Sequence, residues 1–289
     1  MGANVVTLPA VHAEHGIRGF VNRGGLWRLL VVVVVYLAVY LGAGWIGSQI
    51  SGDFGDDDLL SSVGSVFFQL TVSLIVGAIA LAAFSRYMGW APELFGRQPI
   101  YRSRWMWIAP ITVLTPIVLR VLGIDWGEHA FDVVALVLVS GLLIGFVEEL
   151  LYRGISVKML REGGHGEWVV AALSSLVFAL SHSLNLLGGQ SIGTVAPTVG
   201  YTFAFGVLMY LTMRVTGFLI YAMLLHGLTD PTTFLATGGV DKVATGSSST
   251  GLLAAAGLVT FLLIVIGYVL LIFVRGRVAV TRPTEPEAG

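Results

Sequence analysis

The chain has 289 residues, of which 56% are hydrophobic and 11% charged, and its mean hydropathy is +0.86. Soluble domains carry about 25% charged residues, so this composition excludes a water-soluble globular protein. The net charge of -1 provides no basic face for nucleic acid, and the absence of cysteine excludes disulfides, thiolate metal sites and thiol nucleophiles.

Apolar runs long enough to cross a bilayer recur along the whole chain. Four runs contain no charge and cover residues 29–46, 59–84, 192–213 and 251–274. Four others contain polar residues: 105–122 has Arg120, 131–151 has Asp132, Glu148 and Glu149, 168–187 has His182, and 217–235 has His226, Asp230 and Pro231. The pattern predicts an all-α membrane protein with about eight transmembrane helices in one bundle.

The distribution of positive charge predicts the orientation of these helices. Eight spans place both termini on one side, and the loops of that side hold fourteen of the sixteen Lys and Arg residues. They are Arg18, Arg23, Arg28, Arg86, Arg97, Arg102, Arg104, Arg153, Lys158, Arg161, Arg214, Arg275, Arg277 and Arg282. Only Arg120 and Lys242 remain for the other side, and we expect Arg120 to extend to the outer interface. The positive-inside rule therefore predicts that both termini are cytoplasmic.

The positions of the apolar runs divide the chain into three parts. Residues 1–25 are expected to form a cytoplasmic N-terminal segment and residues 278–289 a cytoplasmic tail, both without stable structure. Residues 26–277 form one polytopic membrane domain, because no repeat and no long soluble loop divides them.

Two adjacent carboxylates, Glu148 and Glu149, are costly at membrane depth unless they are paired or reach water. Their helix is expected to continue to Gly163, followed by a short tip and an antiparallel helix from about residue 168. In such a hairpin Glu149 and His182 are equidistant from the tip. The sequence therefore places the glutamate pair and His182 at one level of the membrane.

A second ionisable pair, His226 and Asp230, is spaced i to i+4 and lies on one helical face. A rise of about 1.5 Å per residue from position 217 puts His226 roughly 14 Å along its helix, at a similar depth. Pro231 removes a backbone hydrogen bond and clashes with the carbonyl of Gly227, so we expect a kink beside Asp230.

These residues form three motifs in order, each on its own hydrophobic helix: Glu148-Glu149-x-x-x-Arg153, Phe178-x-x-x-His182 and His226-x-x-x-Asp230. Together they resemble the motifs of the CPBP or Abi family of intramembrane proteases, which contains the type II CAAX prenyl endopeptidases. The resemblance covers a motif core at residues 142–231. It departs from many members only in Asp230, where they have asparagine.

The resemblance implies hydrolysis of a peptide bond within the membrane. Glu148 and His182 would activate a water molecule, and His226 and Asp230 would bind the scissile carbonyl and its oxyanion. Glu148 is then expected to lie closer to His182 than to His226. Asp230 would have to be protonated or act by orienting His226, because a carboxylate cannot donate a hydrogen bond.

Supporting roles are expected for four residues. Glu149 is interpreted mainly as an anchor for Arg153, its i+4 neighbour, and Phe178 as packing or as a wall of the pocket. Asn185, one turn after His182, is either a helix-helix hydrogen bonder or a site residue. Each histidine taken singly is also compatible with a neutral imidazole that hydrogen bonds between helices.

Two other functional classes remain open at this stage. Two histidines and a carboxylate are a plausible catalytic zinc set, although the helical His-Glu-x-x-His pattern is absent, so the preferred prediction has no metal cofactor. A proton-coupled transporter or a scaffold is the non-enzymatic alternative. The expected partners are the lipid bilayer and a peptide or membrane-protein substrate, lipidated or not. The expected location is the bacterial plasma membrane, with the active site opening toward its cytoplasmic half.

Overall fold

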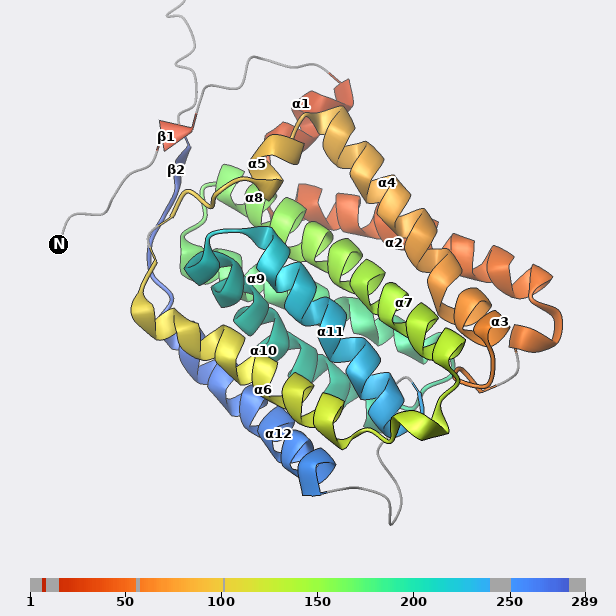
Figure 1. Ribbon diagram of the computed structural model, residues 1–289. Helices are drawn as coiled ribbons and strands as arrows, with labels where there is room; N and C mark the ends of the chain where they lie inside the picture. The colour runs from red at the N-terminus through yellow and green to blue at the C-terminus, as the bar shows by residue number, and fades with distance from the viewer. Residues whose placement is uncertain (1–6, 9–15, 56–57, 101, 240–250, 281–289) are drawn as a thin grey trace, which may run out of the picture.

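The computed structural model describes residues 7–8, 16–55, 58–100, 102–239 and 251–280, and these form a single bundle of helices (Figure 1). The α-helices are α1 (Gly16–Asn22), α2 (Leu26–Ile50), α3 (Val63–Val66), α4 (Val72–Met88), α5 (Ala91–Phe95), α6 (Ile108–Gly123), α7 (Phe131–Glu149), α8 (Ser156–Glu162), α9 (Glu167–Ser181), α10 (Ile192–Thr216), α11 (Leu219–Thr237) and α12 (Gly251–Ile272). Short 3₁₀ or π segments extend several of them, namely η1 (Gly52–Gly55), η2 (Phe67–Thr71), η3 (Arg104–Trp107), η4 (Trp126–Glu128), η5 (Leu150–Ile155) and η6 (His182–Leu186). The predicted all-helical fold is confirmed.

Seven helices within the described residues are long and apolar enough to cross a membrane. They are Leu26–Ile50, Val63–Met88, Arg104–Gly123, Phe131–Glu162, Glu167–Leu186, Ile192–Thr216 and Gly251–Ile272. The eighth predicted span corresponds to α11, a 19-residue helix whose His226, Asp230 and threonines make it more polar than the others. Eight spans therefore remain a prediction, although α11 packs within the bundle against α6, α7 and α10.

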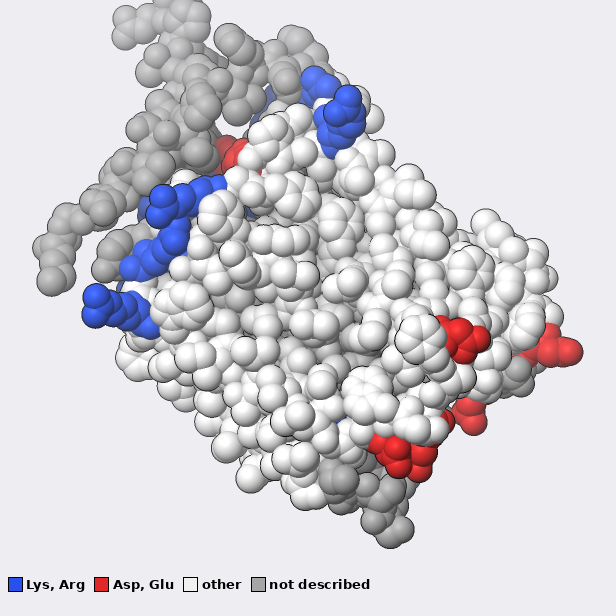
Figure 2. Space-filling view, viewed as in Figure 1, with Lys and Arg blue, Asp and Glu red and all other residues white. Residues whose placement is uncertain are grey.

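Charged side chains gather at the two ends of the visible face. Figure 2 shows Lys and Arg at one end of the bundle, together with a small acidic patch, and further Asp and Glu side chains at the other end, with an uncharged surface between the two ends. Lys242, Asp56, Asp57 and Arg282 lie outside the described residues. This separation is the one that the loop charges predict, and the assignment of the positive end to the cytoplasm remains a prediction.

The two ends of the chain contain more structure than their composition predicts. Residues 16–22 form α1, and Trp90 Nε1 donates a 3.0 Å hydrogen bond to Asn22 Oδ1. Strands β1 (Thr7–Leu8) and β2 (Ala279–Val280) pair in parallel. The expectation of structureless ends was therefore wrong for these residues, because contacts between distant segments stabilise them. Residues 1–6, 9–15 and 281–289 lie outside the described residues.

The helical hairpin that carries two of the motifs has the predicted shape. Helix α7 continues through η5 and α8 to Glu162, and α9 starts at Glu167 after a tip of four residues, Gly163–Gly166. At this tip Arg161 donates from Nε and Nη2 to the two carboxylate oxygens of Glu167, both at 2.8 Å, and Tyr210 also donates to Glu167. A buried polar cluster thus joins α8, α9 and α10.

Arg120 does not extend to the outer interface. Its side chain is buried in the bundle, and Nη2 donates a 2.9 Å hydrogen bond to Thr260 Oγ1 on α12. The expectation was wrong because α6 and α12 lie side by side, so a polar partner was available inside the protein (Figure 1).

Helices α7 and α11 lie in close contact through glycines (Figure 1). A Cβ atom added at Gly145 would lie 2.6 Å from the backbone nitrogen of Gly227 and would also collide with the carbonyl oxygen of Met223. At Gly141 an added Cβ would lie 2.6 Å from the carbonyl oxygen of Gly227. Small residues four apart allow two backbones to approach in this way. Pro231 lies inside α11, which continues to Thr237, so the kink remains a prediction.

Replacing Gly145 with alanine should therefore separate α7 from α11. Overpacking of this kind costs about 1–3 kcal/mol, and here the methyl group meets backbone atoms that cannot rotate away. We expect a lower unfolding temperature in thermal denaturation. Gly257→Ala on α12 is the matched control, because a Cβ there meets no atom within 4 Å. Equal stability of both variants would contradict the proposed role of the contact.

Candidate active site

His226 lies at the centre of the candidate site. Its Nδ1 is 2.7 Å from Glu149 Oε1, while Nε2 lies 3.5 Å from Glu148 Oε2 and 3.6 Å from Asp230 Oδ2. Because an ionised carboxylate only accepts hydrogen bonds, the Nδ1 atom carries hydrogen and donates it to Glu149. The other ring nitrogen then faces Glu148 and Asp230.

Glu149 joins His226 to Arg153. Its Oε1 lies 3.1 Å from Arg153 Nη1, and neither side chain is exposed. The expected i,i+4 pair is therefore present, but Glu149 also orients a histidine from another helix, which the sequence interpretation missed. The guanidinium of Arg153 lies over the ring of Phe178, 4.3 Å from its centre, in a cation-π contact.

The imidazole of His182 is held by its own helix. Its Nδ1 lies 3.0 Å from the carbonyl oxygen of Phe178, which can only accept, so Nδ1 carries the hydrogen. The lone pair of Nε2 is consequently left for another donor. Among the described residues His182 forms no ion pair with Glu148. The expectation that Glu148 lies closer to His182 than to His226 was wrong, because Glu148 faces α11.

Phe178 connects these groups. Its ring meets His182 edge to face at 4.9 Å between ring centres and His226 at 5.9 Å, and Tyr152 packs on it at 5.0 Å. Its side chain is buried, so it packs between these groups. Phe205 of α10 was not singled out from the sequence, yet it packs on His226 at 4.8 Å. A lone aromatic residue in a hydrophobic helix gives no signal for such a contact.

The site has a buried side and an accessible side. Arg153, Glu149 and His226 are buried, whereas the side chains of Glu148 and Asp230 are each 29% exposed and His182 is partly exposed. The accessible groups are therefore two carboxylates and one imidazole. Asn185 lies in η6 after His182, and its backbone carbonyl accepts hydrogen bonds from Gly188 and Gln190.

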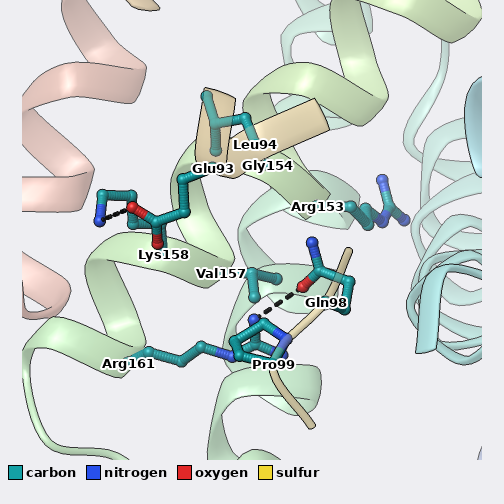
Figure 3. Close-up of a pocket in the computed structure, with 9 residues that line it drawn as sticks. All are labelled: Glu93, Leu94, Gln98, Pro99, Arg153, Gly154, Val157, Lys158 and Arg161. Carbon is teal, nitrogen blue, oxygen red and sulfur yellow. Dashed lines mark hydrogen bonds and ion pairs between the residues drawn. The ribbon is translucent and has the colours of Figure 1, made fainter. Parts of the chain in front are cut away.

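A small cavity of about 20 Å³ lies beside this site rather than in it (Figure 3). Its charged lining residues are paired: Lys158 Nζ lies 2.6 Å from Glu93 Oε2, and Arg161 Nη1 donates to Gln98 Oε1 at 2.8 Å. Arg153 also lines the cavity, but Figure 3 shows its guanidinium pointing away from these pairs. The cavity therefore does not open onto the two histidines.

A zinc centre sets strict requirements on the geometry of the His, Asp and Glu side chains that bind it. A catalytic zinc needs about three ligands that converge within roughly 2.1 Å of one ion. Within the described ranges, no group of three His, Asp or Glu side chains has a geometry that could hold a metal ion. Glu149 occupies Nδ1 of His226 and the Phe178 carbonyl occupies Nδ1 of His182. Both contacts involve Nδ1 and leave Nε2 of each ring facing away from that partner, so the absence of a metal cofactor remains a prediction.

Comparison with known proteins finds a similarity in the middle of the chain. Residues 130–232 match the family model described as Type II CAAX prenyl endopeptidase Rce1-like. The match confirms the resemblance based on the three motifs. The matched segment runs from the start of α7 into α11 and contains all eight candidate residues, from Glu148 to Asp230. It supports a CAAX-type intramembrane endopeptidase. No curated protein matches the chain.

Proposed function

We propose that this protein is a metal-independent intramembrane endopeptidase in which Glu148 and His182 activate water. The observation that carries the proposal is the pair of oriented histidines on one phenylalanine ring. His182 presents the lone pair of Nε2, whereas His226 is held through Nδ1 by Glu149. Two imidazoles fixed in this way can serve two different steps of one reaction.

In the proposed reaction a water molecule binds between His182 Nε2 and the Glu148 carboxylate. Glu148 takes a proton from the water, and the hydroxide oxygen forms a bond to the carbonyl carbon of the substrate. His226 donates from Nε2 to the resulting oxyanion. The C–N bond then breaks, and the proton held by Glu148 passes to the leaving nitrogen, giving a carboxylic acid and an amine. Water is the only co-reactant.

Asp230 acts in this scheme through its charge. Its Oδ2 lies 3.6 Å from His226 Nε2, so a carboxylate there stabilises an imidazolium that donates to the oxyanion. Of the two possibilities open from the sequence, this contact favours an orienting Asp230 over a protonated one. Glu149 supports the same imidazolium from the other ring nitrogen.

The family match and the seven apolar helices support an integral membrane protein with a membrane-associated peptide as substrate. We further propose that the substrate carries a CAAX-type end or a membrane anchor, with or without a lipid, and that the site opens toward the cytoplasmic half of a bacterial plasma membrane.

Chelation separates the proposed mechanism from zinc catalysis. Purified protein should contain well under one equivalent of zinc and should cleave a labelled library of CAAX-type and membrane-anchored peptides equally before and after chelator treatment. Stoichiometric zinc, with activity lost on removal and restored on addition, would replace the glutamate mechanism by the zinc alternative. Absence of cleavage for every peptide would favour a transporter or scaffold.

A further inference from the structure

Several buried polar atoms behind Glu149 have no hydrogen-bond partner among the described residues. They are Glu149 Oε2, the three side-chain nitrogens of Arg153 and Ser175 Oγ. Arg153 Nη1 has Glu149 as an ion-pair partner without hydrogen-bond alignment, while Nη2 and Nε have no acceptor. Buried polar atoms almost always bind a protein group or an ordered water. Five unpartnered polar atoms in one region of the bundle therefore indicate a site for an internal ligand.

Gly206 of α10 shows where this site lies. A Cβ atom added there would lie 2.7 Å from Arg153 Nη2, 3.0 Å from Ser175 Cβ and 3.1 Å from Ser175 Oγ. The guanidinium and the hydroxyl therefore flank the same face of Gly206, although they form no direct hydrogen bond. Three segments, η5, α9 and α10, meet at this point. The absence of a side chain at Gly206 lets the guanidinium and the hydroxyl approach the α10 backbone this closely.

We propose that Arg153, Ser175 and Gly206 form an internal water site, and that the bound water holds Arg153 against Glu149. Water fits because it can accept from Nη2 and donate to the serine oxygen at once. An anion would add a second negative charge beside Arg153, whose charge Glu149 already neutralises. A cation would be repelled by the guanidinium. Ser175 is then a positioning residue for Glu149 and, through it, for His226. This last step rests on the proposed function.

A structure of the full chain in a lipid nanodisc, at a resolution that shows water, tests the site directly. We expect density within about 3 Å of both Arg153 Nη2 and Ser175 Oγ. The Gly206→Ala variant should lack this density, because its methyl group would lie 2.7 Å from Arg153 Nη2 and 3.1 Å from Ser175 Oγ and would displace both groups. A direct bond between Ser175 and Arg153, or a site without density, would overturn the proposal. This measurement needs no activity, so it stands even if the protein proves not to be a peptidase.

Kinetics test the positioning role with a neighbouring serine as control. Ser175→Ala should lower kcat about tenfold with little change in KM, because the buried site touches no substrate. Ser174→Ala should leave both constants near those of the wild type, since within the described part of the chain Ser174 Oγ bonds only the carbonyl of Ala171 on its own helix, at 3.3 Å. Equal kcat values for Ser175→Ala and the wild type would overturn the positioning role. Absence of cleavage by the wild type would instead refute the proposed function.

Discussion

Replacing Glu148 with glutamine should lower kcat by about 10²- to 10⁴-fold, the usual contribution of a general base. Glutamine keeps the size of the side chain and cannot take a proton from water. Glu148 is partly exposed and its nearest ion-pair partner is 3.5 Å away, so the unfolding temperature should change little. Hydrolysis of a peptide that the wild type cleaves, followed with thermal unfolding of the same samples, measures both quantities.

His182→Ala should cause a loss of similar size, because groups that act together on one water are not additive. The double variant with Glu148→Gln should then be no less active than either single variant. Glu93→Gln is a control for loss of a carboxylate, since Glu93 is 42% exposed and pairs with Lys158 away from the histidines. If Glu148→Gln stays active while a folded Glu149→Gln is inactive, the roles of the two glutamates must be exchanged.

The second large effect is expected on stability. Glu149→Gln removes the only ion-pair partner that Arg153 has among the described residues and leaves a guanidinium with 0% exposure unpaired. Breaking a buried ion pair by removing one partner costs about 3–5 kcal/mol, because the remaining charge stays without compensation. The unfolding temperature should fall well below that of Glu148→Gln, and activity should fall with it, since His226 also loses the carboxylate charge that supports its imidazolium.

A double-mutant cycle tests the cause of this destabilisation. Adding Arg153→Met to Glu149→Gln removes the unpaired charge and fills its space with an apolar side chain, so the double variant should be more stable than Glu149→Gln alone. Activity should stay low, because nothing restores the carboxylate charge beside His226. A double variant as unstable as Glu149→Gln would show that the unpaired charge is not the cause.

The helices and the local pairs could be predicted from the sequence because they depend on residues close along the chain. Apolar runs set the spans, and the i,i+4 spacing sets the Glu149–Arg153 ion pair and the hydrogen bond from His182 to the Phe178 carbonyl. Distance from the hairpin tip also predicted a common depth for the motif residues. These relations need no knowledge of how helices turn about their axes.

The direction in which Glu148 faces could not be predicted in the same way. Depth along a helix leaves its rotation open, and neighbouring residues differ by about 100°. The rotation of α11 is set by the contact of Gly227 with Gly141 and Gly145, which joins residues far apart in the chain. The Gly141-x-x-x-Gly145 spacing was the available signal.

The glycine contact between α7 and α11 limits where substrate selectivity could be engineered. Backbone atoms, not side chains, set the distance between the glutamate pair and His226, so this distance cannot be tuned by choosing larger or smaller residues. Substitutions that adapt the site to new substrates are therefore tolerated on the accessible side, around Glu148, Asp230 and His182. A mutant library directed at residues around those three side chains should retain folded protein, whereas one directed at the helix contact should mostly lose it.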